Sequence, residues 1–115
     1  MPLVNILSSN PVPAESRQAL MASMSAFTAL VLRKSESYVM VTVQESPVMM
    51  AGQLGDAVFV DVRSIGGLNA ESTSRLTEGI CKRIKEHIGT APKRVYVNFT
   101  DVRASLWGWD GHTFG

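Results

Sequence analysis

The second residue of the chain has the most unusual chemical potential. Proline follows Met1 directly, and because proline is small, we expect the initiator methionine to be removed, which leaves Pro2 with a secondary amine. An α-amino group has an ordinary pKa of ~7.7 to 8.0, and an apolar pocket with a nearby cation lowers that pKa. Because a general base works best with a pKa near the operating pH, Pro2 is a candidate base.

A purely structural interpretation of Pro2 stays open. Proline at the start of a strand loses no ladder hydrogen bond, so the residue needs no chemical role to be accommodated there. If Met1 is retained, the nitrogen of Pro2 belongs to a tertiary amide and has no useful basicity.

A base that removes a proton next to a carbonyl creates an enolate, which needs positive charge or hydrogen-bond donors nearby. Lys34 is the candidate for binding a substrate carboxylate or the developing oxyanion. A lysine at the end of a helix is also favoured by the helix dipole alone, without any ligand. Arg33 lies beside it, and a shift of one residue around this turn would exchange their roles.

Aromatic residues could supply a pocket for a phenyl or indole ring through stacking and burial, although each could instead pack in a core or an oligomer interface. These candidates are Tyr38, Trp107, Trp109 and Phe114. The single cysteine, Cys81, and the histidines His87 and His112 show no spacing typical of metal ligands. We therefore expect neither a metal nor a cofactor.

Composition indicates one domain, residues 1–115, with 45% apolar residues. The 11 Lys and Arg nearly balance the 10 Asp and Glu, so nothing favours nucleic acid or an anionic membrane as a partner. Residues 1–5 lack the features of a signal peptide, and no run approaches the ~20 apolar residues that span a bilayer. The expected location is the cytoplasm, or outside the cell by a route that needs no signal peptide.

We expect two β-α-β units to position the candidate residues described above. Apolar periodicity predicts strands and helices in the same order twice, which gives an α+β two-layer fold with a four-stranded sheet and both helices on one face. The predicted elements are strand 3–7, helix 14–32 and strand 38–43, then strand 57–62, helix 70–88 and strand 94–100.

Three predicted strands carry apolar side chains toward both faces of the sheet, because successive residues point to opposite sides. These segments are residues 39–41, 58–60 and 95–97. Two helices cover only one face, so a homo-oligomer packed through its sheets is predicted. The alternative is that long loops cover the second face.

The order and spacing of several short motifs resemble the macrophage migration inhibitory factor family, which includes D-dopachrome tautomerase, within the tautomerase superfamily. The resemblance covers almost the whole chain. The motifs are Met1-Pro2 before a strand, Lys34 four residues before Tyr38, Ser64-Ile65-Gly66-Gly67, Arg94-Val95-Tyr96-Val97-Asn98, and Gly108-Trp109 with Thr113-Phe114.

This resemblance implies a homotrimer whose sheets enclose a barrel, with three active sites between subunits. It implies keto-enol tautomerase activity on phenylpyruvate-like keto acids with Pro2 as the base, and a substrate contact from the backbone N–H of Ile65. It also implies that Tyr96 and Asn98 reach the site from the adjacent subunit, although packing in a core or in the trimer would explain both residues equally well. Trp107 replaces a smaller aliphatic residue, which predicts a reshaped pocket.

Two other functions remain alternatives. One is a cytokine-like binding protein with a vestigial pocket, for which a receptor or protein partner is unknown. The other is a dehalogenase or hydratase of the same superfamily, in which a protonated proline is an acid and pocket arginines polarise a carboxylate and a water. Arg94 and Arg103 are the nearest candidates for such arginines.

Overall fold

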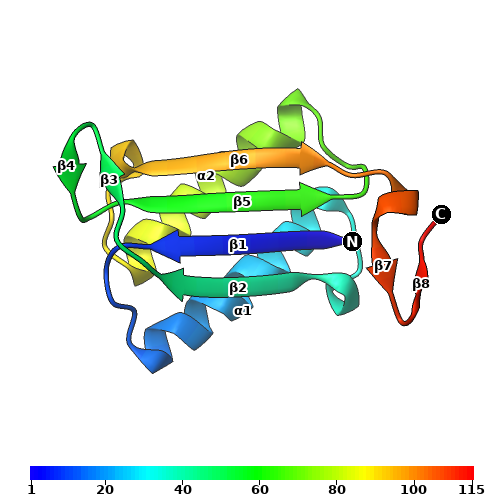
Figure 1. The fold of residues 1–115 in the computed structure, drawn as a ribbon, viewed down its shortest axis with the longest axis horizontal. Helices are drawn as coiled ribbons and strands as arrows, with labels where there is room; N and C mark the ends of the chain where they lie inside the picture. The colour runs from blue at the N-terminus through cyan, green and yellow to red at the C-terminus, as the bar shows by residue number, and fades with distance from the viewer.

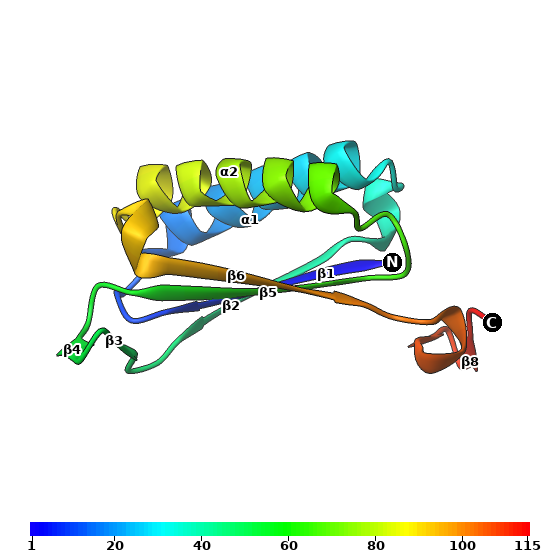
Figure 2. The same ribbon diagram turned by 90° about the horizontal axis from the view of Figure 1, so that it is seen from above.

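The computed structural model describes residues 1–115 as two layers, a mixed four-stranded sheet and two helices (Figure 1). Both helices, α1 (Ala14–Leu32) and α2 (Ala70–His87), cover the same face of the sheet (Figure 2). The strand order is β2-β1-β5-β6, with parallel pairs β1–β2 and β5–β6 joined by the antiparallel pair β1–β5. The strands are β1 (Pro2–Ser8), β2 (Met40–Glu45), β5 (Val58–Ser64) and β6 (Val95–Asp101). The predicted α+β fold with two β-α-β units is confirmed.

Two short hairpins lie at opposite ends of the sheet, and both are displaced toward the side away from the helices (Figures 1 and 2). One joins β2 to β5, and the other forms the C-terminal tail. Single turns of 3-10 helix precede β2, β6 and the tail. These elements are β3 (Met49–Met50), β4 (Gln53–Leu54), β7 (Gly108–Trp109), β8 (His112–Thr113), η1 (Glu36–Tyr38), η2 (Pro92–Arg94) and η3 (Ala104–Leu106).

The start of the second predicted strand was wrong by two residues. Tyr38 lies in η1, and β2 begins at Met40. The side chain of Ser35 accepts a hydrogen bond from the backbone N–H of Ser37, which caps this turn. Local capping by serine therefore overrides the strand propensity of Tyr38.

The core forms between alternate residues of the strands and one stripe of each helix. The predicted stripe of α2 is confirmed, because its three leucine and isoleucine residues are fully buried. Asn69 and Ser72 start this helix with a capping box. The principal core residues are Val4, Ile6, Leu20, Met24, Val31, Val58, Val60, Val62, Leu76, Ile80 and Ile84.

The opposite face of the sheet is open. Met40, Phe59 and Tyr96 are 63%, 36% and 67% exposed there, so no loop covers them and that alternative is wrong. The strand register arranges this face in three rows that run across the strands. The middle row is polar, although we expected apolar side chains on both faces of the sheet. The end row is Gln44, Leu7, Phe59 and Tyr96; the middle row is Thr42, Asn5, Asp61 and Asn98; the third row is Met40, Leu3, Arg63 and Thr100.

Candidate active site

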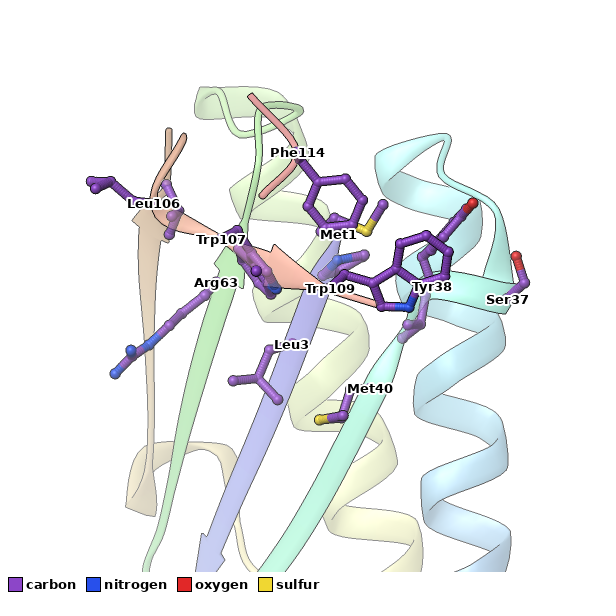
Figure 3. Close-up of a pocket in the computed structure, with 14 residues that line it drawn as sticks. Met1, Leu3, Ser37, Tyr38, Met40, Arg63, Leu106, Trp107, Trp109 and Phe114 are labelled. Atoms are coloured by element: carbon purple, nitrogen blue, oxygen red, sulfur yellow. The ribbon is translucent and has the colours of Figure 1, made fainter. Parts of the chain in front are cut away.

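A cavity of about 470 Å³ opens at the end of the sheet where β1 begins (Figure 3). Its walls come from the N-terminus, from η1 and the start of β2, and from the C-terminal tail. Ten of its 14 lining residues are hydrophobic, which suits an organic substrate with a substantial apolar part. The lining residues are Met1, Pro2, Leu3, Ser37, Tyr38, Val39, Met40, Arg63, Val102, Leu106, Trp107, Gly108, Trp109 and Phe114.

Pro2 lies within this cavity because it is the first residue of β1. It pairs with Ser64 in the antiparallel ladder between β1 and β5, and its side chain is fully buried. The ladder therefore fixes the beginning of the chain beside the turn that follows β5. Met1 extends from Pro2 into the cavity, among the aromatic side chains of its rim (Figure 3).

The electrostatic surroundings of the chain start favour a neutral amine. Burial of the N-terminal ammonium of Met1 lowers its pKa below the ordinary value, and the positive charge of Lys34 lowers this pKa further. Both effects disfavour the protonated form of an amine. An amine at this position therefore stays neutral down to a lower pH than an exposed α-amino group does.

Lys34 and Ile65 lie together, although neither lines the cavity. Helix α1 ends at Leu32, and its cap residue Arg33 has a left-handed backbone with φ of 55°. The N–H of Lys34 donates to the carbonyl of Ala29 at 3.0 Å. The Nζ of Lys34 donates to the carbonyl oxygen of Ile65 at 2.7 Å. The predicted pair is thus brought into direct contact.

Ile65 is the first residue of the turn that follows β5. None of the hydrogen bonds outside the regular helices and strands uses the N–H of Ile65. Gly66 and Gly67 have positive φ values of 71° and 80°, a conformation that glycine adopts without strain. Ser64 Oγ donates to the carbonyl of Gly66 at 2.7 Å, and the N–H of Gly66 donates to Asp101 Oδ1 at 3.0 Å, so the turn is firmly held.

Three of the predicted aromatic residues form a cluster at the rim of the cavity. The rings of Tyr38 and Trp109 meet edge to face with centroids 5.4 Å apart, and Phe114 stacks on Trp109 at 5.8 Å. Trp107 also lines the cavity, and its carbonyl accepts the N–H of Phe114 at 3.1 Å. The tail is therefore folded back so that its rings wall the site.

Within one chain, Tyr96 and Asn98 lie outside the cavity that contains Pro2. Both are on the open face of β6, in the end row and the middle row, and neither lines the cavity. Tyr96 is 67% exposed. One chain alone therefore brings together only part of the predicted set.

The structure also places at the cavity a residue that sequence analysis missed. Arg63 is the only charged side chain in its lining, and its guanidinium pairs with Asp61 Oδ2 at 3.0 Å. Strand alternation alone could have placed Arg63 on the open face, but only the pairing of Arg63 with Leu3 brings it beside the chain start.

The arginines singled out in the sequence lie elsewhere, since Arg94 binds backbone carbonyls at the other end of the sheet and Arg103 does not line the cavity. No group of three or more His, Cys, Asp or Glu residues is arranged to hold a metal ion. Neither helix has the length and apolar character needed to cross a membrane.

Comparisons with known proteins agree with this geometry. The family model "Macrophage migration inhibitory factor (MIF)" matches residues 1–115. A macrophage migration inhibitory factor homolog from Trichuris trichiura is 32% identical over 108 residues, which cover 92% of this chain and 95% of the homolog.

Solved structures show the same fold. A macrophage migration inhibitory factor homologue from Prochlorococcus marinus is 37% identical with a TM-score of 0.92, and the match covers 98% of this chain and 99% of that chain. The related protein from Entamoeba histolytica is 26% identical with a TM-score of 0.93, and the match covers 98% of both chains. This chain therefore belongs to the macrophage migration inhibitory factor family.

Proposed function

We propose that the protein is a keto-enol tautomerase of phenylpyruvate-like 2-oxo acids that uses Pro2 as its general base after removal of Met1. One observation carries this proposal. The start of the chain lies in an apolar cavity, where burial and Lys34 lower the pKa of the Met1 amine. The same surroundings would act on the Pro2 amine once Met1 is removed, and would favour the neutral form that can take a proton next to a carbonyl.

The reaction needs only a proton shift. The neutral Pro2 nitrogen takes a proton from the carbon next to the 2-oxo group, and the C–H electron pair forms the enolate. Lys34 and the backbone N–H of Ile65 hold the carboxylate or stabilise the negative oxygen. The prolinium then returns its proton to that oxygen, which gives the enol and restores the base.

The aromatic end of the substrate would occupy the cluster of Tyr38, Trp109 and Phe114. Edge-to-face and stacked ring pairs are each worth about 0.5–1.5 kcal/mol beyond simple burial. The ring spacings of 5.4 and 5.8 Å show that these side chains already adopt favourable pair geometries. A bound phenyl ring would take the space that Met1 fills when it is present (Figure 3).

We further propose that the active protein is a homotrimer with the sites between subunits. Tyr96 and Asn98 do not line the cavity of their own chain, so a neighbouring copy would supply them if they contact substrate. The open sheet face, with exposed Met40, Phe59 and Tyr96, offers apolar surface that such copies would cover.

The test combines intact mass with catalysis. We expect protein that lacks Met1 to catalyse enol-keto exchange of phenylpyruvate, followed by ultraviolet absorbance of the enol. Replacing Pro2 by glycine should lower kcat/KM by about 10² to 10⁴, the range typical of a lost general base. A Pro2→Gly variant with the full rate would show that the base lies elsewhere, and no turnover by the Met1-free protein would favour a cytokine-like binding role.

A hydratase or dehalogenase has less support from the site. Those reactions call for pocket arginines that polarise a carboxylate and a water, and Arg94 and Arg103 do not line the cavity. Arg63 does line it, but its Nε and Nη2 both donate to Asp61. Turnover of phenylpyruvate without hydration of an unsaturated acid would separate these functions.

A further inference from the structure

The peptide group between Ile65 and Gly66 is held from both sides by charged side chains. Its carbonyl oxygen accepts a hydrogen bond from the Nζ of Lys34 at 2.7 Å, and its N–H donates to Asp101 Oδ1 at 3.0 Å. A trans peptide group is planar, with its C=O and N–H pointing in opposite directions. The ammonium and the carboxylate therefore lie on opposite sides of one peptide group, and each faces the partial charge of opposite sign.

Asp101 reaches this peptide group because of the strand pairing. Strands β5 and β6 are parallel and finish at the same end of the sheet (Figure 1), and Asp101, the last residue of β6, pairs with Ser64, the last residue of β5. The N–H of Val102 also donates to the carbonyl of Ser64 at 2.8 Å. That carbonyl shares a peptide group with the N–H of Ile65, so this N–H points away from Val102. The end of β6 therefore orients two successive peptide groups.

This arrangement leaves the ammonium of Lys34 available for an anion. An ammonium has three donors, and the bond to Ile65 is the only hydrogen bond that the side chain of Lys34 makes within the chain. The only ion pair of the chain joins Arg63 and Asp61, so no carboxylate neutralises Lys34 directly. Its charge still acts on the Met1 amine, which indicates that the ammonium lies near the chain start. The intervening peptide group thus holds the ammonium without using its other donors.

We propose that Asp101 is a positioning residue for the anion site of the reaction. It acts through the Ile65–Gly66 peptide group, which holds the ammonium of Lys34, and together with Val102 it sets the direction of the Ile65 N–H. The ligand of this site is the carboxylate of the 2-oxo acid, which accepts from both donors. Hydrogen bonds with an ionised partner are stronger than neutral ones, so the two charged side chains orient this peptide group closely. This inference rests on the proposed tautomerase function and adds the residue that aligns its substrate-binding donors.

The test uses variants of Asp101 that separate its acceptor oxygen from its charge. Asp101→Ala removes the acceptor for the N–H of Gly66. Asp101→Asn removes the charge but keeps an acceptor oxygen, so it should preserve most of the positioning. Glu78→Ala is the matched control, because Glu78 is an exposed carboxylate of α2 that makes no side-chain hydrogen bond or ion pair.

The probes are 3-phenylpropanoate, an acid without the reactive 2-oxo group, and its uncharged methyl ester. Their binding can be followed by the fluorescence of Trp107 and Trp109, which both line the cavity. This measurement needs no turnover. Steady-state kinetics with phenylpyruvate then show whether KM changes in parallel.

We expect Asp101→Ala to raise the dissociation constant of the acid about 10-fold, which corresponds to 1.4 kcal/mol, and that of the ester by less than about 2-fold. KM for phenylpyruvate should rise with the dissociation constant of the acid. Asp101→Asn should stay within about 3-fold of wild type for both probes, and Glu78→Ala should match wild type. A general loss of structure would weaken binding of the acid and the ester alike, so the selective loss identifies positioning of the anion site.

A double variant tests whether Asp101 acts through Lys34. Residues that share one hydrogen-bonded network have effects that do not add. Adding Asp101→Ala to Lys34→Gln should therefore weaken binding of the acid by less than the two separate effects combined. Fully additive effects would show that Asp101 acts independently of Lys34.

Asp101→Ala protein that binds the acid as wild type does, or that loses the acid and the ester equally, would overturn the proposal. Should Asp101→Ala fail to fold by circular dichroism, Asp101→Val removes the same acceptor with a higher strand propensity. Wild-type protein that binds the acid through Asp101 but does not turn over phenylpyruvate would contradict the tautomerase function and leave this role of Asp101 intact.

Discussion

Lys34 affects the chain start although it does not line the cavity. Its Nζ binds the carbonyl of Ile65, and its charge lowers the pKa of the terminal amine, second in size to the effect of burial. One side chain would therefore have two roles, which are to keep the base neutral and to attract an anionic substrate. These roles can be separated by pH.

Replacing Lys34 by glutamine should move the acid limb of the profile of kcat/KM against pH toward higher pH. Loss of a nearby positive charge favours the protonated amine, so the pKa of the Pro2 amine rises and a higher pH is needed to free it. We expect KM for phenylpyruvate to rise as well. Arg33→Gln is the control, because Arg33 precedes Lys34 without binding Ile65, and an unchanged acid limb in Lys34→Gln would contradict the role assigned here.

The ring cluster gives a second prediction at this scale. Trp109 contacts both Tyr38 and Phe114, so Trp109→Leu should raise KM for phenylpyruvate about 10-fold, from ring interactions worth about 0.5–1.5 kcal/mol each. KM for pyruvate, which has no ring, should change much less. Equal effects on both substrates in steady-state kinetics would show that Trp109 does not contact the ring.

Most residues of the candidate site were selected from the sequence, but Arg63 was missed. The aromatic residues of the cavity were selected by side-chain type, Lys34 by its spacing to Tyr38, and Ile65 by the family resemblance. Arg63 was missed because its position beside the chain start follows from the antiparallel pairing of β5 with β1, which connects positions far apart in the sequence. Spacing along the chain carries no information about such a pairing.

At the scale of elements, the two helices touch through a glycine. A Cβ added at Gly79 of α2 would lie only 2.0 Å from the Phe27 ring of α1. The guanidinium of Arg83 lies 3.9 Å from the centroid of the same ring, and its Nε donates to Ser23 Oγ at 2.9 Å. The absence of a side chain at position 79 therefore makes room for this contact between the helices.

Gly79→Ala should lower the free energy of unfolding by up to about 2 kcal/mol. Overpacking costs about 1–3 kcal/mol, and the higher helix propensity of alanine returns about 1 kcal/mol. In a Phe27→Ala background the clash is gone, and the same change should become stabilising. Urea denaturation of the four proteins measures this coupling, and equal effects in both backgrounds would refute the contact.

The helices and strands were easier to predict from the sequence than the residues at which they begin and end. The helix bounds of 14–32 agree with α1, because the periodic apolar residues extend over the whole helix. The strand that follows was placed too early, since η1 depends on a side-chain cap that strand propensity does not describe. Local hydrogen bonds of this kind decide where an element starts.

At the scale of the whole molecule, the two halves of the proposed site lie on separate parts of one chain. Pro2 is in the cavity at one end of the sheet, and Tyr96 and Asn98 are on the open face of β6. The sequence predicted an open face but not its polar middle row, because the rows exist only once four strands are in register.

Mixing two impaired variants should restore activity. Pro2→Gly replaces the secondary amine of the base with a primary amine, and Asn98→Ala lacks a residue that we assign to the neighbouring site, so sites formed between them can be intact. After unfolding and joint refolding at equal amounts, about a quarter of the sites should combine a wild-type Pro2 with a wild-type Asn98. Activity no higher than the sum of the separate variants would exclude a shared site.

Asp56 ties three loops together at the end of the sheet opposite the cavity. Hydrogen bonds from Asn10 and Thr90, with a smaller effect of Arg94, lower the pKa of this carboxyl below its ordinary value. Its contribution to stability is therefore present above the ordinary pKa of an aspartate and is lost as the pH falls through the lower folded pKa. Asp56→Asn should reduce the loss of Tm between pH 5 and 2, and identical Tm profiles would contradict this.

The ion pair of Arg63 and Asp61 on the open face has a consequence for the choice of buffer. With these side chains 53% and 17% exposed, dissolved salt reaches the pair in a separated chain, and the Debye length falls from about 10 Å at 0.1 M to about 3 Å at 1 M. Copies that enclosed this face would shield the pair from those ions. The response of thermal stability to ionic strength would then report whether the chains are apart or together.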